Sequence, residues 1–234
     1  MTSSTFKAAL FVALSVTASS LLAETRITLV VVDPPGEGFN DPTPAVPVGG
    51  NTGATIGEQR LIALKHAAAI WSSRLDSPVP IRVRSSFSSL PCATKSGTLA
   101  ATDKPEVFIS NGQHPEFIPN VWYPAALANR ISEMVLDPDM EEIVTTFNDG
   151  IGQPDCLANL QWYYGLDNRA PVSQADMVAT LLHELAHGLG FGPLSRSDFS
   201  KFRDRGDVFS QYALDTSTGK SWNEMTNQER AVSP

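Results

Sequence analysis

Residues 177–189 constrain the fold most strongly, because their side-chain pattern fits an amphipathic helix. Apolar residues recur there at helical spacing: Val178, Leu181, Leu182, Leu185 and Leu189. Ser173 and Asp176 lie just before them, and both are residue types that cap the first turn of a helix. A stripe of this kind has to be covered by other parts of the chain. The segment therefore predicts a helix that packs one side on a core and keeps the other side free.

The rest of the chain supplies both strands and helices for that core. Thr55 and Glu58 form a capping-box pattern that begins a helix running to about Leu75, and Pro124 begins a second helix. Residues 33–51 are rich in Pro and Gly and predict an irregular loop. Strands are expected at residues 27–32, 81–87, 106–110 and 141–147. Because strands and helices do not alternate regularly, the predicted fold class is α+β.

Composition excludes several classes of protein. The chain has 234 residues, of which 42% are hydrophobic, so it is long enough to bury a substantial core. Its formal net charge is −8 and it has no basic cluster. This balance argues against nucleic acid and against an anionic membrane surface as partners.

The first residues have the pattern of an export signal. A short polar start with one lysine, Lys7, is followed by an apolar, small-residue run that ends near Ala23. Serine and threonine interrupt this run, which is also short for a membrane-spanning helix of about 20 apolar residues. We expect residues 1–23 to be a cleaved signal peptide rather than a buried helix or an anchor, and residues 24–234 to form one secreted domain. No later segment is expected to span a membrane.

The two cysteines are consistent with an exported protein. Cys92 and Cys156 lie in loop-like, proline-flanked segments, and neither has a second Cys or a His at ligand spacing. In an oxidising compartment we expect them to form one disulfide, in preference to two buried thiols or metal ligands.

The polar side of the helix carries residues that can bind a metal. Residues 183–187 have the sequence HELAH, which matches the H-E-x-x-H pattern. His183 and His187 are one helical turn apart, so both imidazoles can reach one Zn²⁺ at about 2.0–2.1 Å. Glu184 is rotated away from that line and can instead take a proton from water as a general base, because zinc lowers the pKa of bound water to about 7. We favour this site over a pair of core histidines.

The segment HELAHGLGF resembles the active-site helix of zincin metallopeptidases, and its glycines resemble the metzincin version of the motif. More widely, the chain is similar to secreted bacterial peptidases that carry a protease-associated domain. The similar stretches are FNDPTPAVPVGGNTGATIGEQRLIALKHAAAIW, QWYYGLDN, LLHELAHGLGF and MTNQER. The resemblance implies a zincin-like domain with a mixed sheet, and it suggests residues 141–147 as the sheet edge along which a peptide substrate aligns.

One position departs from the metzincin pattern. Pro193 stands where a third zinc ligand, His or Asp, is expected, and proline cannot bind a metal. Asp207 is the preferred substitute, with Asp198 and Asp204 as alternatives; in the resembling proteins the chain continues well past this point, so the ligand can also lie beyond Pro234. Further residues considered for the site are His66 and His114 as ligands, Met225 below the metal and Tyr212 as an oxyanion donor.

These observations predict a secreted zinc metalloendopeptidase that acts on proteins or peptides. Its zinc ligands would be His183 and His187, with Glu184 as the catalytic base. Two alternatives stay open. One is a catalytically inactive or truncated secreted protein that keeps a zinc-holding helix, and the other is a metal-dependent hydrolase of a non-peptide ester or amide.

Overall fold

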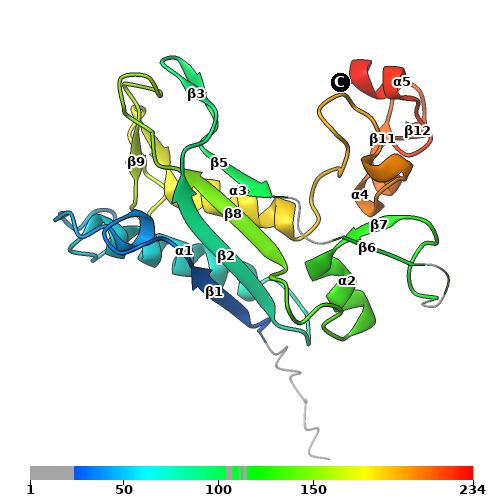
Figure 1. The fold of residues 1–234 in the computed structure, drawn as a ribbon, viewed down its shortest axis with the longest axis horizontal. Helices are drawn as coiled ribbons and strands as arrows, with labels where there is room; N and C mark the ends of the chain where they lie inside the picture. Colours follow the sequence, from blue (N-terminus) through cyan, green and yellow to red (C-terminus); the bar gives the residue numbers. More distant parts are fainter. Residues whose placement is uncertain (1–23, 104–106, 111, 113–114, 234) are drawn as a thin grey trace, which may run out of the picture.

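The structure is a computed structural model that describes residues 24–103, 107–110, 112 and 115–233. The predicted signal peptide, residues 1–23, lies outside the described residues. Four strands form the central sheet in the order β1-β2-β8-β5 (Figure 1). They are β1 (Ile27–Val31), β2 (Ile81–Ser88), β8 (Ile143–Asn148) and β5 (Ala100–Asp103). The first three run parallel and β5 is antiparallel to β8, so the sheet is mixed and the α+β prediction is confirmed.

Two helices cover one face of this sheet. Helices α1 (Ile56–Ser72) and α3 (Met177–Gly188) contact each other and lie behind the strands in Figure 1. Side chains of β2 alternate accordingly, since Val83 is fully buried against the helices whereas Arg84 is exposed. The core between sheet and helices contains Leu64, Val83, Ile143, Phe147, Met177, Leu181 and Leu185.

The local sequence signals explain where the helices begin. Thr55 caps α1 and forms the predicted capping box with Glu58, but the helix ends at Ser72 rather than at Leu75. The second predicted helix is α2 (Ala125–Ser132), whose N-cap residue is Pro124. It packs in a smaller core of its own, built around Phe117, Val121, Tyr123 and Ala128.

The remaining elements are short. They are η1 (Gly38–Asn40), β3 (Cys92–Ala93), β4 (Ser96–Gly97), β6 (Val107–Ile109), β7 (Trp122–Pro124), β9 (Gln161–Tyr163), β10 (Gln174–Asp176), η2 (Phe202–Asp204), α4 (Val208–Tyr212), β11 (Leu214–Asp215), β12 (Lys220–Ser221) and α5 (Asn227–Val232). No helix in the described part of the chain is long and apolar enough to cross a membrane.

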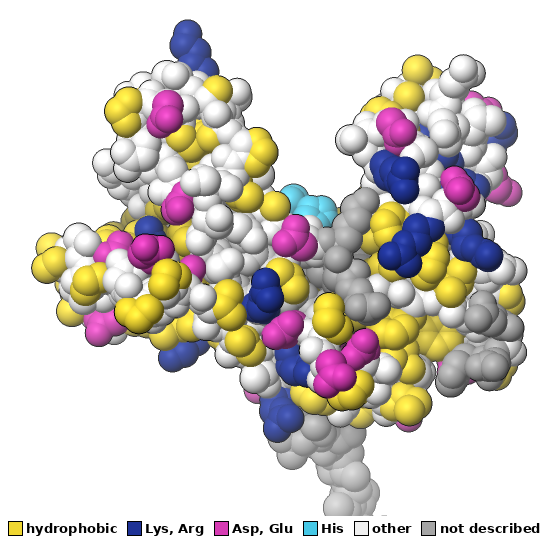
Figure 2. All heavy atoms as spheres, viewed as in Figure 1, with side chains coloured by type: hydrophobic (Ala, Val, Ile, Leu, Met, Phe, Trp, Pro, Cys, Tyr) yellow, Lys and Arg dark blue, Asp and Glu magenta, His cyan; other side chains and the backbone are white. Residues whose placement is uncertain are grey.

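Residues 194–233 form a C-terminal lobe beside the end of α3 (Figure 1). Arg230 is buried in it and donates hydrogen bonds to the main-chain carbonyls of Phe199 and Trp222. The Lys220 ammonium lies 2.5 Å from Glu229 and lowers the pKa of that carboxyl to about 2. Figure 2 shows a notch in the surface between this lobe and the part of the molecule that carries β3 and β9.

The prediction that residues 141–147 form an edge of the sheet is wrong. Strand β8, which contains most of residues 141–147, pairs with β2 on one side and with β5 on the other, so it lies inside the sheet. The edge on that side of the sheet is β5, a segment whose short sequence, AATD, gave no strand prediction. Its alanines and polar residues carry little β propensity, and pairing with β8 determines its conformation.

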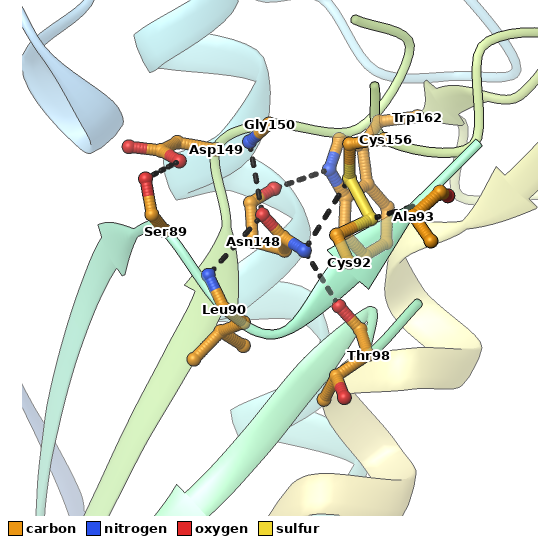
Figure 3. The surroundings of a disulfide bond; sticks show 10 residues. All are labelled: Ser89, Leu90, Cys92, Ala93, Thr98, Asn148, Asp149, Gly150, Cys156 and Trp162. Carbon is orange, nitrogen blue, oxygen red and sulfur yellow. Dashed lines mark hydrogen bonds between the residues drawn. A yellow bond between two sulfur atoms is a disulfide. The ribbon is translucent and has the colours of Figure 1, made fainter. Parts of the chain in front are cut away.

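Cys92 and Cys156 form a disulfide, as predicted (Figure 3). The bond joins the β3–β4 hairpin to the loop after β8. Asn148 is buried beside it, and its side-chain amide donates a 2.8 Å hydrogen bond to the Thr98 carbonyl. Gly97 faces the bridge so closely that an added Cβ would lie 2.3 Å from the Cys92 sulfur. The disulfide therefore anchors one wall of the notch seen in Figure 2.

Replacing both Cys92 and Cys156 by serine is expected to lower the free energy of unfolding by about 4 kcal/mol, because the bridge closes a loop with a sequence separation of 64 residues. Chemical denaturation of the variant and of the oxidised wild type measures this difference. Reduced wild-type protein is the matched control and should behave like the variant. Equal denaturation midpoints for the oxidised and reduced proteins would contradict a stabilising bridge.

Candidate metal centre

Helix α3 presents its two faces as the sequence predicts. Asp176 caps it, accepting a 2.9 Å hydrogen bond from the Ala179 amide. Leu181 and Leu185 on the inner face are buried, whereas His183 and His187 are exposed. Histidine side chains are visible in Figure 2 at the bottom of the notch, over the place where α3 lies in Figure 1.

The two imidazoles converge on one point. Their Nε2 atoms are 3.0 Å apart, and the ring centroids of His183 and His187 are 4.5 Å apart with an interplanar angle of 88°. Two zinc–nitrogen bonds of about 2.05 Å at a tetrahedral angle place their nitrogens about 3.3 Å apart. The structure thus brings these nitrogens to within a few tenths of an ångström of the spacing that one zinc ion requires.

The outer nitrogen of His187 is held by the chain that follows the helix. Its Nδ1 lies 2.8 Å from the carbonyl oxygen of Phe191. A carbonyl only accepts hydrogen bonds, so Nδ1 is the donor, and in the neutral ring this arrangement leaves the lone pair on Nε2, where a metal can bind. This contact needs the chain to reverse after α3, and Gly190 makes the reversal with a φ of 105°, a conformation that glycine adopts readily.

Glu184 is placed differently from its histidine neighbours. It is buried, and its Oε2 lies 2.8 Å from the hydroxyl of Thr102 on β5. The same hydroxyl also lies 2.8 Å from the main-chain oxygen of Glu184. A buried, hydrogen-bonded carboxylate beside two converging imidazoles can exchange a proton with water in the notch.

Asp207, the preferred third ligand, is not brought to the histidine pair. Within the described ranges no group of three His, Cys, Asp or Glu residues is arranged to hold a metal. Asp207 is buried as the N-cap of α4, where Oδ1 accepts a 2.8 Å hydrogen bond from the Ser210 amide. Its Oδ2 accepts a bond from the Leu194 amide at 3.1 Å. The carboxylate thus anchors the first residues of the C-terminal lobe, which is a structural role.

The other residues considered for the metal site lie in different parts of the chain. Asp198 accepts hydrogen bonds from Ser200 in an exposed turn, and these bonds lower the pKa of its carboxyl. His66 lies on α1, and His114 lies outside the described residues. Met225 is buried in the C-terminal lobe.

An apolar groove borders the turn that follows α3. Its volume is about 640 Å³, and it lies between α2, the turn after α3 and the C-terminal lobe. The side chains that line it include Tyr123, Leu127, Phe191, Val208, Phe209 and Tyr212. Phe191 connects the groove to the site, because its carbonyl holds His187. Tyr212, considered as an oxyanion donor, is 76% exposed at the rim of this groove.

Two hydrogen-bond partners of the candidate site residues were not identified from the sequence. Thr102 is far from Glu184 along the chain and belongs to a strand without a recognisable pattern. The Phe191 carbonyl is a main-chain group, which no side-chain pattern identifies. Comparisons with protein-family models, curated proteins and solved structures found no match.

Proposed function

We propose that this chain is a secreted, zinc-dependent metalloendopeptidase with a zincin-like domain. The observation that carries the proposal is the pair of converging imidazole nitrogens on α3, one of which has its tautomer fixed by a main-chain carbonyl. His183 and His187 would hold the zinc, and the donor set, neutral imidazole, is one that zinc favours. When bound, the metal supplies Lewis acidity.

The protein's own contribution to catalysis would come from Glu184. Its carboxylate is buried on α3 next to His183 in the chain, and it would take a proton from the attacking water and later deliver it to the departing amine. The hydrogen bond from Thr102 holds one carboxylate oxygen and leaves the other for this exchange.

The shape of the site supports a peptide as the substrate. Strand β5 is one of the two edges of the central sheet, and its Thr102 contacts Glu184. An extended peptide can add to such an edge through main-chain hydrogen bonds, with its side chains entering neighbouring pockets. The apolar groove lined by Phe191, whose carbonyl contacts His187, would favour a substrate with a large apolar side chain near the scissile bond.

The direct test is metal analysis of the purified protein together with a peptidase assay. We expect about one zinc per chain, and we expect a chelator to abolish cleavage of an unstructured protein substrate because the metal is needed for both binding and chemistry. Adding zinc back should restore cleavage. Cleavage that persists in the fully zinc-free protein would contradict the proposal.

One observation favours a second candidate, a secreted zinc-binding protein that does not cleave. Asp207 is used as a helix cap, and the described residues supply two ligands rather than three. Stoichiometric zinc without any cleavage in the same assay would select this candidate. Hydrolysis of small esters but of no peptide would select a non-peptide hydrolase.

A further inference from the structure

Thr102 is hydrogen-bonded to the carboxylate of Glu184. Its hydroxyl is 2.8 Å from Oε2 and equally close to the main-chain oxygen of the same residue. A hydroxyl carries one hydrogen, so it can donate to only one of these acceptors at a time. The contact with Oε2 is the one that can orient the side chain, because the main-chain oxygen is already fixed by the helix.

The position of this hydroxyl is fixed by the sheet. In the register, Thr102 lies opposite Thr145 of β8, and Thr145 lies opposite Ser85 of β2. Partners directly opposite each other share a face, so all three hydroxyl residues lie on the face that packs against α3. Thr145 and Ser85 are each 1% exposed and hydrogen-bond to each other at 2.9 Å. Hydroxyl residues of three neighbouring strands thus lie side by side in the layer between sheet and helix, and the one on β5 contacts Glu184.

We propose that Thr102 is a positioning residue for Glu184. By donating to Oε2 it fixes the carboxylate in one orientation and leaves the other oxygen for proton exchange with water. A rigid strand is suited to this task because β5 is held along its whole length by β8. This inference rests on the proposed function for its kinetic effect, but the orientation of Glu184 can be measured independently.

The test replaces Thr102 by valine, which keeps the branched shape and removes the hydroxyl. We expect kcat to fall about 10- to 100-fold, as for the loss of other groups that orient active-site residues, with KM changed less than about threefold. Thr102→Ser should restore most of kcat. Thr146→Val is the matched control and should leave kcat unchanged, because Thr146 lies on β8 with its side chain on the opposite face of the sheet.

A crystal structure of the metal-free protein provides the second measurement. Glu184 should occupy one conformation in the wild type and in Thr102→Ser, and should be displaced or multiple in Thr102→Val. A valine variant with wild-type kcat, or with Glu184 unmoved, would overturn the proposal while leaving a peptidase function intact. If the wild type cleaves no peptide, the proposed function fails, and the conformation of Glu184 alone decides the role of Thr102.

Discussion

Glu184→Gln is expected to retain zinc and to lose about 10²- to 10⁴-fold in kcat, the usual contribution of a general base. Glutamine has the same shape as glutamate, and its amide oxygen can still accept the hydrogen bond from Thr102. It cannot take a proton from water, so only the proton transfer should be lost. Steady-state kinetics on a peptide substrate, with zinc content measured on the same sample, separates these two effects.

The control for this substitution is Glu37→Gln, which makes the same chemical change at an exposed position before η1. That variant should match the wild type in both zinc content and kcat. Full activity of Glu184→Gln would refute the assignment of Glu184 as the base. Loss of zinc from Glu184→Gln would instead show that the carboxylate helps to hold the metal rather than accepting a proton from water.

The fold could be predicted wherever a local signal decides the structure. The capping box at Thr55 and the apolar stripe of α3 depend on neighbouring residues, and both are confirmed. Strands β2 and β8 were found from their β-branched and alternating residues, but their order in the sheet was not. Strand order depends on contacts between distant segments, and the family resemblance suggested residues 141–147 as an edge at a place where the structure has β5.

The candidate site shows the same difference between features set by neighbouring residues and features set by contacts between distant segments. The spacing of His183 and His187 was enough to predict that their rings lie on one exposed face, because helix geometry alone sets it. The partner of Glu184 could not be found in this way, since Thr102 reaches it only through the pairing of β5 with β8. Asp207 was preferred for its position after the motif. The sequence around it, Asp-Val-Phe-Ser, also fits an N-cap, and the structure shows that use.

His187→Ala is expected to weaken zinc binding by more than about 100-fold, because even partners that only orient a ligand contribute about 10- to 100-fold. The substitution removes one of the two converging nitrogens and also the bond to the Phe191 carbonyl. Competition with a metal-binding dye measures the loss. His66→Ala is the control, since His66 lies on α1 and is not grouped with the pair.

Thermal unfolding shows whether His187→Ala affects only metal binding or also the stability of the fold. His187 is exposed, so the zinc-free variant should unfold within about 0.5 kcal/mol of the zinc-free wild type. Added zinc should raise the unfolding temperature of the wild type, because an ion that binds only the folded state stabilises it, and should leave His187→Ala unchanged. A variant that keeps its zinc and still gains stability from it would place the metal elsewhere, and the peptidase proposal would lose its basis.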